Sequence, residues 1–146
     1  MVFGADRYIA FGWTLTGHDE LEPQASPNAD RIKAMRSVGN DGFKTWASIE
    51  PVIDFRSSLD MIYQALNAGC QHFKIGLLTS NTRVCRDKYD MNDCLHFVED
   101  VMRITSGKAT VYWKQSVRDF IGHDLEFHID IDEHSVGKDW SIFNNK

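Results

Sequence analysis

The sequence predicts a mixed α/β domain, a partial (half) β/α barrel of about four parallel βα units with a C-terminal tail strand. Four short runs rich in aromatic and aliphatic residues alternate with segments whose apolar residues recur at helical spacing. Such alternation is typical of a parallel sheet. The 146 residues, 42% of them hydrophobic, suit one domain with its own core. We therefore expect a single domain over 1–146, with the β/α part at 8–121 and an extension at 122–146.

The first predicted unit has a clear beginning and end. An aromatic strand at 8–16 is followed by a polar loop at 17–24. Ser26 is the predicted N-cap of the next helix, because its hydroxyl can accept a hydrogen bond from a free backbone N–H, and Pro27 suits the first helical position. Gly39 is expected to end this helix. Its apolar positions are Ile32, Met35 and Val38.

The remaining three units repeat this order. Their predicted strands lie at 43–49, 72–78 and 109–113. Ser57 and Asp90 are the predicted N-caps of the two helices between these strands, and Gly69 and Gly107 are expected to end them. The other predicted segments are a long polar loop at 79–89 and a short helix at 117–121.

Side chains of opposite character alternate along the predicted strands. One set is mostly apolar and should pack against helices: Phe11, Trp13, Leu15, Thr45, Ala47, Ile49, Phe73, Ile75, Leu77, Val111 and Trp113. The other set is mixed and polar: Gly12, Thr14, Thr16, Lys44, Trp46, Ser48, Lys74, Gly76, Thr110, Tyr112 and Lys114. A sheet covered by helices on both faces should be apolar on both. The pattern therefore favours a partial barrel with a polar interior over a doubly wound sheet.

The tail has the alternating pattern of a half-exposed strand. Its apolar residues are Leu125, Phe127, Ile129 and Ile131, and the residues between them are Glu126, His128, Asp130 and Asp132. Such a strand can cover an open sheet edge. The histidine and aspartates, with His134, are also potential metal ligands, but a solvated edge is the more common role of such residues. We therefore predict no metal site.

Candidate site residues follow the predicted strands, because parallel β/α folds place their sites at the carboxyl ends of strands. The predicted ligand-facing residues are Thr14, Thr16, Ser48, Glu50 and Lys114. Glu50 and Lys114 both belong to the polar set of strand positions. They could face each other across the open end of the barrel, where they would position a substrate amine or carboxylate. The alternative is an ion pair that only closes the barrel end. Pro51 is expected to end its strand sharply and to fix the direction of Glu50.

Composition limits the class of protein. The formal net charge of −5 argues against a broad nucleic-acid surface, and 83–88 is the only basic stretch. Three cysteines at irregular spacing predict reduced thiols rather than a disulfide framework. No leader pattern or membrane-spanning apolar run is visible. We expect a cytoplasmic protein that takes a small-molecule ligand.

Several short motifs resemble a known family. The stretch LEPQASPNADRIKAM, followed by FKTWASIEPVID and, after a helix, by AGCQHFKIGLL, resembles the middle-to-late barrel of radical SAM proteins. It is most similar to the branch of spore photoproduct lyase-like and phage-associated members. There an acidic loop leads to a helix with Arg-Ile, here Arg31-Ile32, and the next strand ends in Glu-Pro, here Glu50-Pro51. The strand end 112–115 is also similar, and the resemblance covers about 8–121.

The resemblance implies a TIM-type barrel open to one side, with S-adenosylmethionine over the strand ends near the five candidate residues. It also implies a 4Fe-4S cluster, but the family's C-x-x-x-C-x-x-C loop is absent from this sequence, so we expect no cluster in this chain. The expected function is that of the C-terminal part of a radical-SAM-like barrel, which contributes cofactor and substrate contacts. It would be an enzyme only when joined to a cluster-bearing N-terminal segment. The alternative is a non-catalytic ligand-binding or assembly domain.

An oligomer is also expected. A sheet cut from a barrel exposes an edge at its first strand, where Tyr8, Phe11 and Trp13 form an apolar surface. Two-fold association is the commonest way to bury matching surfaces. We therefore predict a homodimer, with the first strand or the open inner face at its interface.

Overall fold

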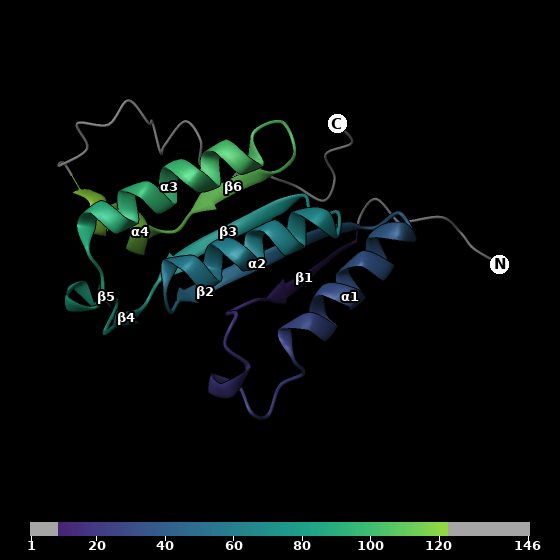
Figure 1. The fold of residues 1–146 in the computed structure, drawn as a ribbon, viewed down its shortest axis with the longest axis horizontal. Coiled ribbons are helices and arrows are strands. Elements are labelled where there is room, and N and C mark those ends of the chain that lie inside the picture. The colour runs from purple at the N-terminus through teal and green to yellow at the C-terminus, as the bar shows by residue number, and fades with distance from the viewer. Residues whose placement is uncertain (1–8, 123–146) are drawn as a thin grey trace.

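The computed structural model describes residues 9–122, which form a mixed α/β domain around a four-stranded parallel sheet (Figure 1). The sheet strands are β1 (Ala10–Thr14), β2 (Lys44–Val52), β3 (His72–Leu77) and β6 (Thr110–Trp113). The helices are α1 (Asn28–Asn40), α2 (Phe55–Asn67), α3 (Met91–Thr105) and α4 (Gln115–Ile121). The short elements are η1 (Asp19–Leu21), β4 (Thr79–Ser80), β5 (Arg83–Val84) and η2 (Arg86–Lys88). The predicted α/β class and parallel sheet are confirmed.

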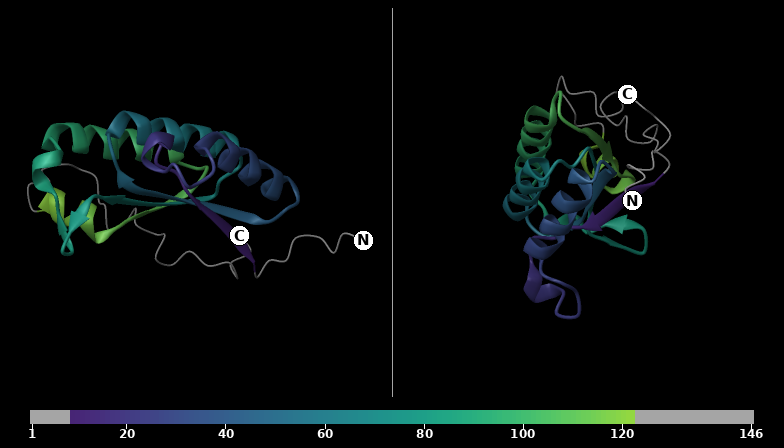
Figure 2. Two further views of the ribbon diagram at one scale, coloured as in Figure 1. Left: turned by 90° about the horizontal axis from the view of Figure 1, so that it is seen from below. Right: turned by 90° about the vertical axis from the view of Figure 1, so that its right-hand side faces the viewer.

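The spatial order of the strands, β1-β2-β3-β6, follows their order along the chain. Every neighbouring pair is parallel, so the carboxyl ends of all four strands lie at one edge of the sheet. Helices α1, α2 and α3 lie side by side on one face, as the two views in Figure 2 show. The short helix α4 follows β6 and packs against α3, β3 and the β4–β5 hairpin. The strand ends therefore meet at one edge of the sheet, with α4 and the hairpin beside them.

The sheet has two different faces. The covered face packs under the helices and consists of Thr45, Ala47, Ile49, Phe73, Ile75, Leu77, Val111 and Trp113, all buried. The open face consists of Gly12, Thr14, Lys44, Trp46, Ser48, Glu50, His72, Lys74, Gly76, Thr110, Tyr112 and Lys114, and most of these residues are partly or fully exposed. Burial alternates residue by residue along β2 as far as Glu50. The predicted division into an apolar and a polar face is confirmed, except that Phe11 at the β1 edge is 39% exposed.

Two of the three predicted helix caps are wrong. Helix α1 has Pro27 rather than Ser26 at its N-cap, and the carboxylate of Asp19 accepts the hydrogen bond of the Asn28 N–H at 2.7 Å instead. Helix α2 begins at Phe55, and Asp54 caps it by accepting the N–H of Ser57 at 2.7 Å. An acidic side chain reaches the free N–H groups in each case and also suits the positive end of a helix dipole. The predicted cap Asp90 of α3 is confirmed.

Strand β2 does not end at Pro51. It continues to Val52 through a cis Glu50–Pro51 peptide, and its register with β3 shifts between Ile49 and Val52. A proline is tolerated inside a sheet where such an irregularity leaves no ladder bond for its missing N–H.

The predicted loop at 79–89 contains the β4–β5 hairpin and η2. Asn81 and Thr82 form its two-residue turn with φ of 50° and 66°, the backbone that a tight hairpin requires. The predicted tail strand at 125–132 lies outside the described residues. Among residues 9–122, no helix combines the length and apolar character needed to cross a bilayer.

Candidate functional site

Glu50 and Lys114 form an ion pair at the carboxyl end of the open face. The Lys114 Nζ lies 3.0 Å from Oε1 and 2.8 Å from Oε2 of Glu50. The carboxylate lies on the bare backbone of Gly76 between them, since a Cβ at that position would overlap with Glu50 Oε2. About a third of each side chain is exposed, 35% for Glu50 and 39% for Lys114. The structure thus brings together the two residues that the sequence predicted to face each other at the strand ends.

The next row of the open face contains two further candidate residues. Thr14, Ser48, Lys74 and Tyr112 are register partners across β1, β2, β3 and β6. Thr14 is exposed and Ser48 half-buried, so both hydroxyls border the same surface as the ion pair. Lys74 was not among the predicted site residues, although it shares their parity. Its Nζ lies 4.8 Å from the ring centroid of Trp46, close enough for a cation–π contact.

Thr16 lies apart from this surface, in the loop after β1. It is 5% exposed, and its hydroxyl donates to Glu22 at 2.7 Å. Its N–H donates to the side-chain oxygen of Asn28 at 3.1 Å. Thr16 therefore joins the β1–α1 loop to the start of α1, and its polar groups are used within the chain.

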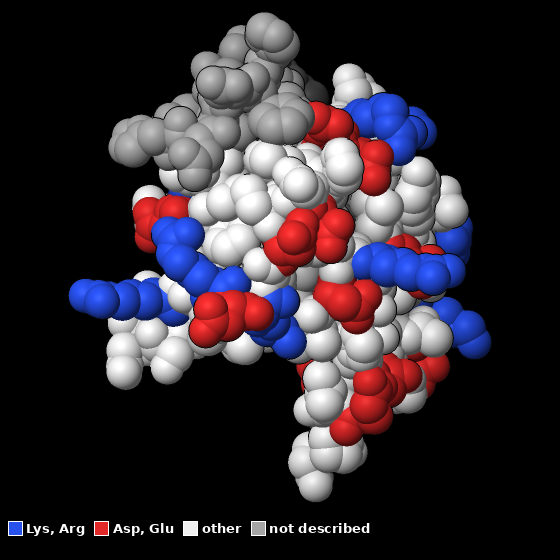
Figure 3. Space-filling model, turned by 60° about the vertical axis from the view of Figure 1, so that its left-hand side comes forward, with Lys and Arg blue, Asp and Glu red and all other residues white. Residues whose placement is uncertain are grey.

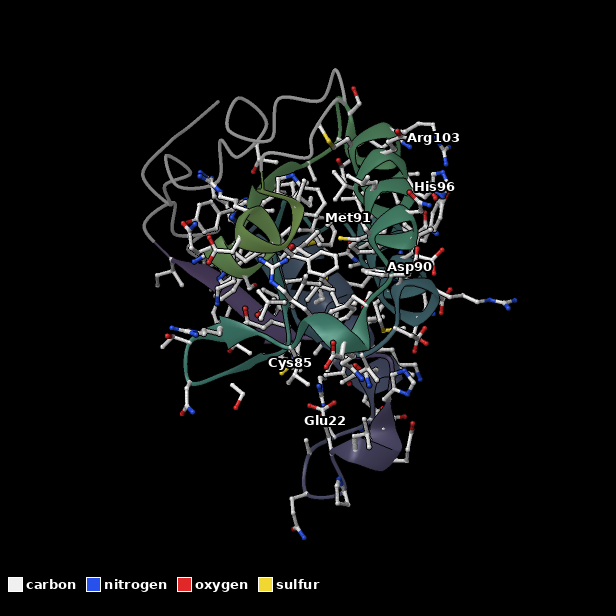
Figure 4. The ribbon with its side chains drawn as sticks, turned by 90° about the vertical axis from the view of Figure 1, so that its left-hand side faces the viewer. Glu22, Cys85, Asp90, Met91, His96 and Arg103 are labelled. Atoms are coloured by element: carbon white, nitrogen blue, oxygen red, sulfur yellow. The ribbon has the colours of Figure 1, made fainter. Side chains whose placement is uncertain are left out.

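Arg31, on helix α1, holds the same loop through hydrogen bonds to its backbone. It is 8% exposed and donates to the carbonyl oxygens of Thr14 at 2.7 Å and Ser26 at 2.9 Å. Its guanidinium also lies 3.2 Å from Glu22, which is labelled in the lower part of the molecule in Figure 4. The Arg-Ile motif that suggested the family thus holds the end of β1 in place.

His18 links this loop to helix α2. Its Nδ1 lies 2.7 Å from Glu20 Oε1 and its Nε2 lies 2.5 Å from Asp54 Oδ2. The hydrogen bonds to Glu20 and then Asp54 raise the pKa of His18 above its usual value. When the ring is protonated it donates to both carboxylates, and the imidazolium then has no free nitrogen to accept a proton. The geometry therefore favours a structural clamp over a general base.

The cysteines do not suit a metal cluster. Cys70 and Cys94 are 3% and 0% exposed, and burial raises the pKa of each thiol to about 12. Iron–sulfur clusters require thiolates, and only Cys85 is partly exposed. Within residues 9–122 no group of three or more His, Cys, Asp or Glu residues is arranged to hold a metal ion. The implied 4Fe-4S cluster therefore does not fit the cysteines of this chain.

The basic stretch at 83–88 is partly used within the fold. Arg86 donates to the backbone carbonyl oxygens of Asp119 and Phe120 at the end of α4. Figure 3 shows acidic and basic side chains interspersed over the side of the molecule near the strand ends. This arrangement gives no support to a phosphate-binding patch here.

A groove that the sequence did not predict lies between the first halves of α2 and α3. Its volume is about 500 Å³, and Phe55, Tyr89 and Phe97 line its apolar part. Asp90 and His96 at its rim lie along α3 in Figure 4. Asp90 already caps α3, and the charged residues that line the groove include Arg56, Lys88 and Asp93.

We compared the chain with models of known protein families, with curated proteins and with solved structures, and none of the three comparisons found a match. The geometry of the strand ends is therefore the main guide to function.

Proposed function

We propose that this chain is the C-terminal part of a radical-SAM-like barrel whose strand ends contact cofactor and substrate. The observation that supports it best is the Glu50–Lys114 pair on the open face, at the carboxyl end of parallel strands. Sequential strand order with α1, α2 and α3 on one face (Figure 2) is what part of a TIM-type barrel requires. In such a barrel the open face would line the interior.

The open face suits S-adenosylmethionine as a ligand. Its carboxylate and ammonium match Lys114 and Glu50, and Ser48 and Thr14 offer hydroxyls to its ribose or its amino-acid end. In the family that the sequence resembles, the bound cofactor is a source of a substrate radical once a cluster reduces it. Because the cysteines here do not fit a cluster, we propose catalysis only when a cluster-bearing segment joins the chain.

The test is direct binding of S-adenosylmethionine to the full chain by calorimetry. Glu50→Gln should weaken binding about tenfold, because a neutral amide loses the charge-assisted contact to the ammonium. Glu99→Gln, a half-buried glutamate on α3, is the matched control and should bind normally. If Glu50→Gln unfolds the chain and any refolded fraction binds normally, the pair only closes the barrel end.

A non-catalytic ligand-binding or assembly domain is the second candidate, and the buried cysteines favour it. Anaerobic reconstitution with iron and sulfide tests the cysteine argument on which both candidates depend. We expect no stoichiometric iron on this chain alone. A stable brown species with bound iron would contradict both the cysteine argument and this candidate.

We also propose a cytoplasmic homodimer that pairs at the edge of β1. Among the described residues β1 pairs with β2 alone, and Ile9 and Phe11 are 43% and 39% exposed there. Burial of such an apolar edge in a second copy removes it from water. Sedimentation at tens of micromolar should show a dimer that Phe11→Lys dissociates, whereas a monomeric wild type would overturn the proposal.

A further inference from the structure

The open face is basic in an acidic chain. The cationic side chains on or beside it are Lys44, Lys74, Lys114 and Arg118. Arg118 belongs to α4, and its guanidinium lies 5.6 Å from the ring centroid of Tyr112 on the open face. Glu50 is the single carboxylate among the open-face residues defined above, and it is paired with Lys114. Among residues 9–122, the open face itself therefore holds three lysines and one carboxylate, although the formal net charge of the chain is −5.

Lys74 lies near the centre of this face. It projects from the second of the two inner strands, β3, and is half-buried beside Trp46. Among residues 9–122, no carboxylate lies within ion-pair distance of Lys74. Burial, and then the charge of Lys74, lower the pKa of the neighbouring His72 to about 4, so that the imidazole is neutral at neutral pH. A half-buried ammonium without a carboxylate is best satisfied by an anionic group placed over the sheet.

The chain itself contains a suitable anionic segment. Residues 123–146 include six acidic residues and two lysines. They continue from Gly122 at the end of α4, which borders the open face through Arg118. The eight residues 125–132, if extended, would span about 27 Å, whereas four strands are about 15 Å across. The segment is thus long enough, and begins close enough, to cross the face.

We propose that residues 125–132 of the same chain dock across the open face and supply, within one chain, the wall opposite the sheet. Leu125, Phe127, Ile129 and Ile131 would lie against Trp46 and Tyr112. Lysine stems are long enough to pass beside an overlying strand, so Lys74 pairs with carboxylates on its outer side, such as Asp130 and Asp132.

Zero-length coupling of amines to carboxylates with a carbodiimide tests this on the full chain, without any cofactor. We expect an intramolecular product that joins Lys74 to an acidic residue of 123–133, identified by mass spectrometry of the monomer. About 1 M salt should reduce its yield, because such salt shortens the range of charge attraction to about 3 Å. Lys74→Met abolishes the product, and Lys108→Met, an exposed lysine after α3, leaves it unchanged.

A charge exchange keeps the test valid if one variant folds poorly. In the Asp130→Lys, Asp132→Lys variant, coupling of the two introduced amines to acidic residues of the sheet should be low. It should rise about tenfold when Lys74→Glu is added. Labelled and unlabelled chains are also mixed before coupling. If the cross-links then join only different chains, the occupant of the open face is a second copy of the protein. Products of Lys74 with residues 9–122 alone would show that the segment does not dock there. Either result overturns the proposal, whatever the outcome for S-adenosylmethionine.

Discussion

The covered and open faces of the sheet come from the same strands but differ in chemistry. On β2, Ala47 and Ile49 are fully buried under the helices, while Ser48 and Glu50, which alternate with them, remain accessible on the other side. A strand directs successive side chains to opposite faces, so one residue separates the dry core from the polar surface. The comparison teaches that substitutions one position apart should have different consequences. Those on the covered face should reduce stability, and those on the open face should reduce binding.

The largest effect is expected on the covered face, at Phe73. Its side chain is fully buried on β3, and Phe73→Ala should lower the free energy of unfolding by about 3–5 kcal/mol, because it leaves a cavity. Urea denaturation measures this loss. Leu21→Ala, at a position that is 58% exposed, is the control and should change stability by less than about 0.5 kcal/mol. Equal losses in both variants would mean that the covered face is not the core.

The next largest effect is expected at the carboxyl edge of the sheet, at the start of α2. Asp54→Ala should cost about 1 kcal/mol, because the Ser57 N–H loses its acceptor. Asp54→Asn keeps an oxygen for that N–H but loses the charge beside His18, so it should cost less. Thermal or urea unfolding of both variants separates the cap from the ion pair. If Ser57→Ala lost more stability than Asp54→Ala, Ser57 would be the N-cap, as the sequence predicted.

A smaller effect on stability, but a clear one on the open face, is expected for Gly76→Ala. The new methyl group would meet the Glu50 carboxylate, which must move away from its present place. Because that carboxylate ends a flexible side chain and is partly exposed, we expect a stability loss below about 1 kcal/mol. Carbodiimide coupling between Glu50 and Lys114 should fall markedly. Gly39→Ala, where a Cβ makes only an ordinary 3.7 Å contact, should leave that coupling intact.

The smallest effect is expected at His18, and it depends on pH. Because folding raises the pKa of His18 above 6.5, its ion pairs stabilise the folded chain fully below that pH, and the stabilisation is lost as the pH rises through the folded value. Partly exposed pairs of this kind contribute about 1 kcal/mol or less. Urea unfolding at about pH 5.5 and about pH 8.5 should show a wild-type loss that His18→Gln lacks. His96→Gln, on the exposed side of α3, should retain the wild-type pH dependence.

Much of this comparison could be predicted from the sequence, because it depends on a period of two. That alternation identified the buried residues such as Phe73 and placed Glu50 opposite Lys114. It could not show that Thr16 turns into the loop. The strand ends at Thr14, and beyond it side chains no longer alternate between the two faces of the sheet. Nor could it choose Asp54 over Ser57 as a cap, because both are good capping residues three positions apart.

The contact between Lys74 and Trp46 was missed for a different reason. Both residues lie on the polar parity, but a strand pattern contains no information on how side chains bend over the sheet. Trp46 leans over Gly12, where a Cβ would overlap with its ring. A glycine opposite an aromatic residue in a neighbouring strand was the available signal, and it needs the register of the strands to be known. The groove between α2 and α3 likewise depends on packing between helices rather than on any local motif.

The sequential strand order has a consequence for cutting and rejoining the chain. Helices α1, α2 and α3 each return to the next strand of the sheet through a short turn, at residues 41–43, 68–71 and 106–109, and all three turns lie at the amino edge of the sheet. The Glu50–Lys114 pair, the His18 clamp and the hairpin lie at the opposite edge. New termini or a fused tag at 106–109 would therefore interrupt no contact of the strand-end surface, so circular permutants and split halves opened there are suitable reporters of its assembly.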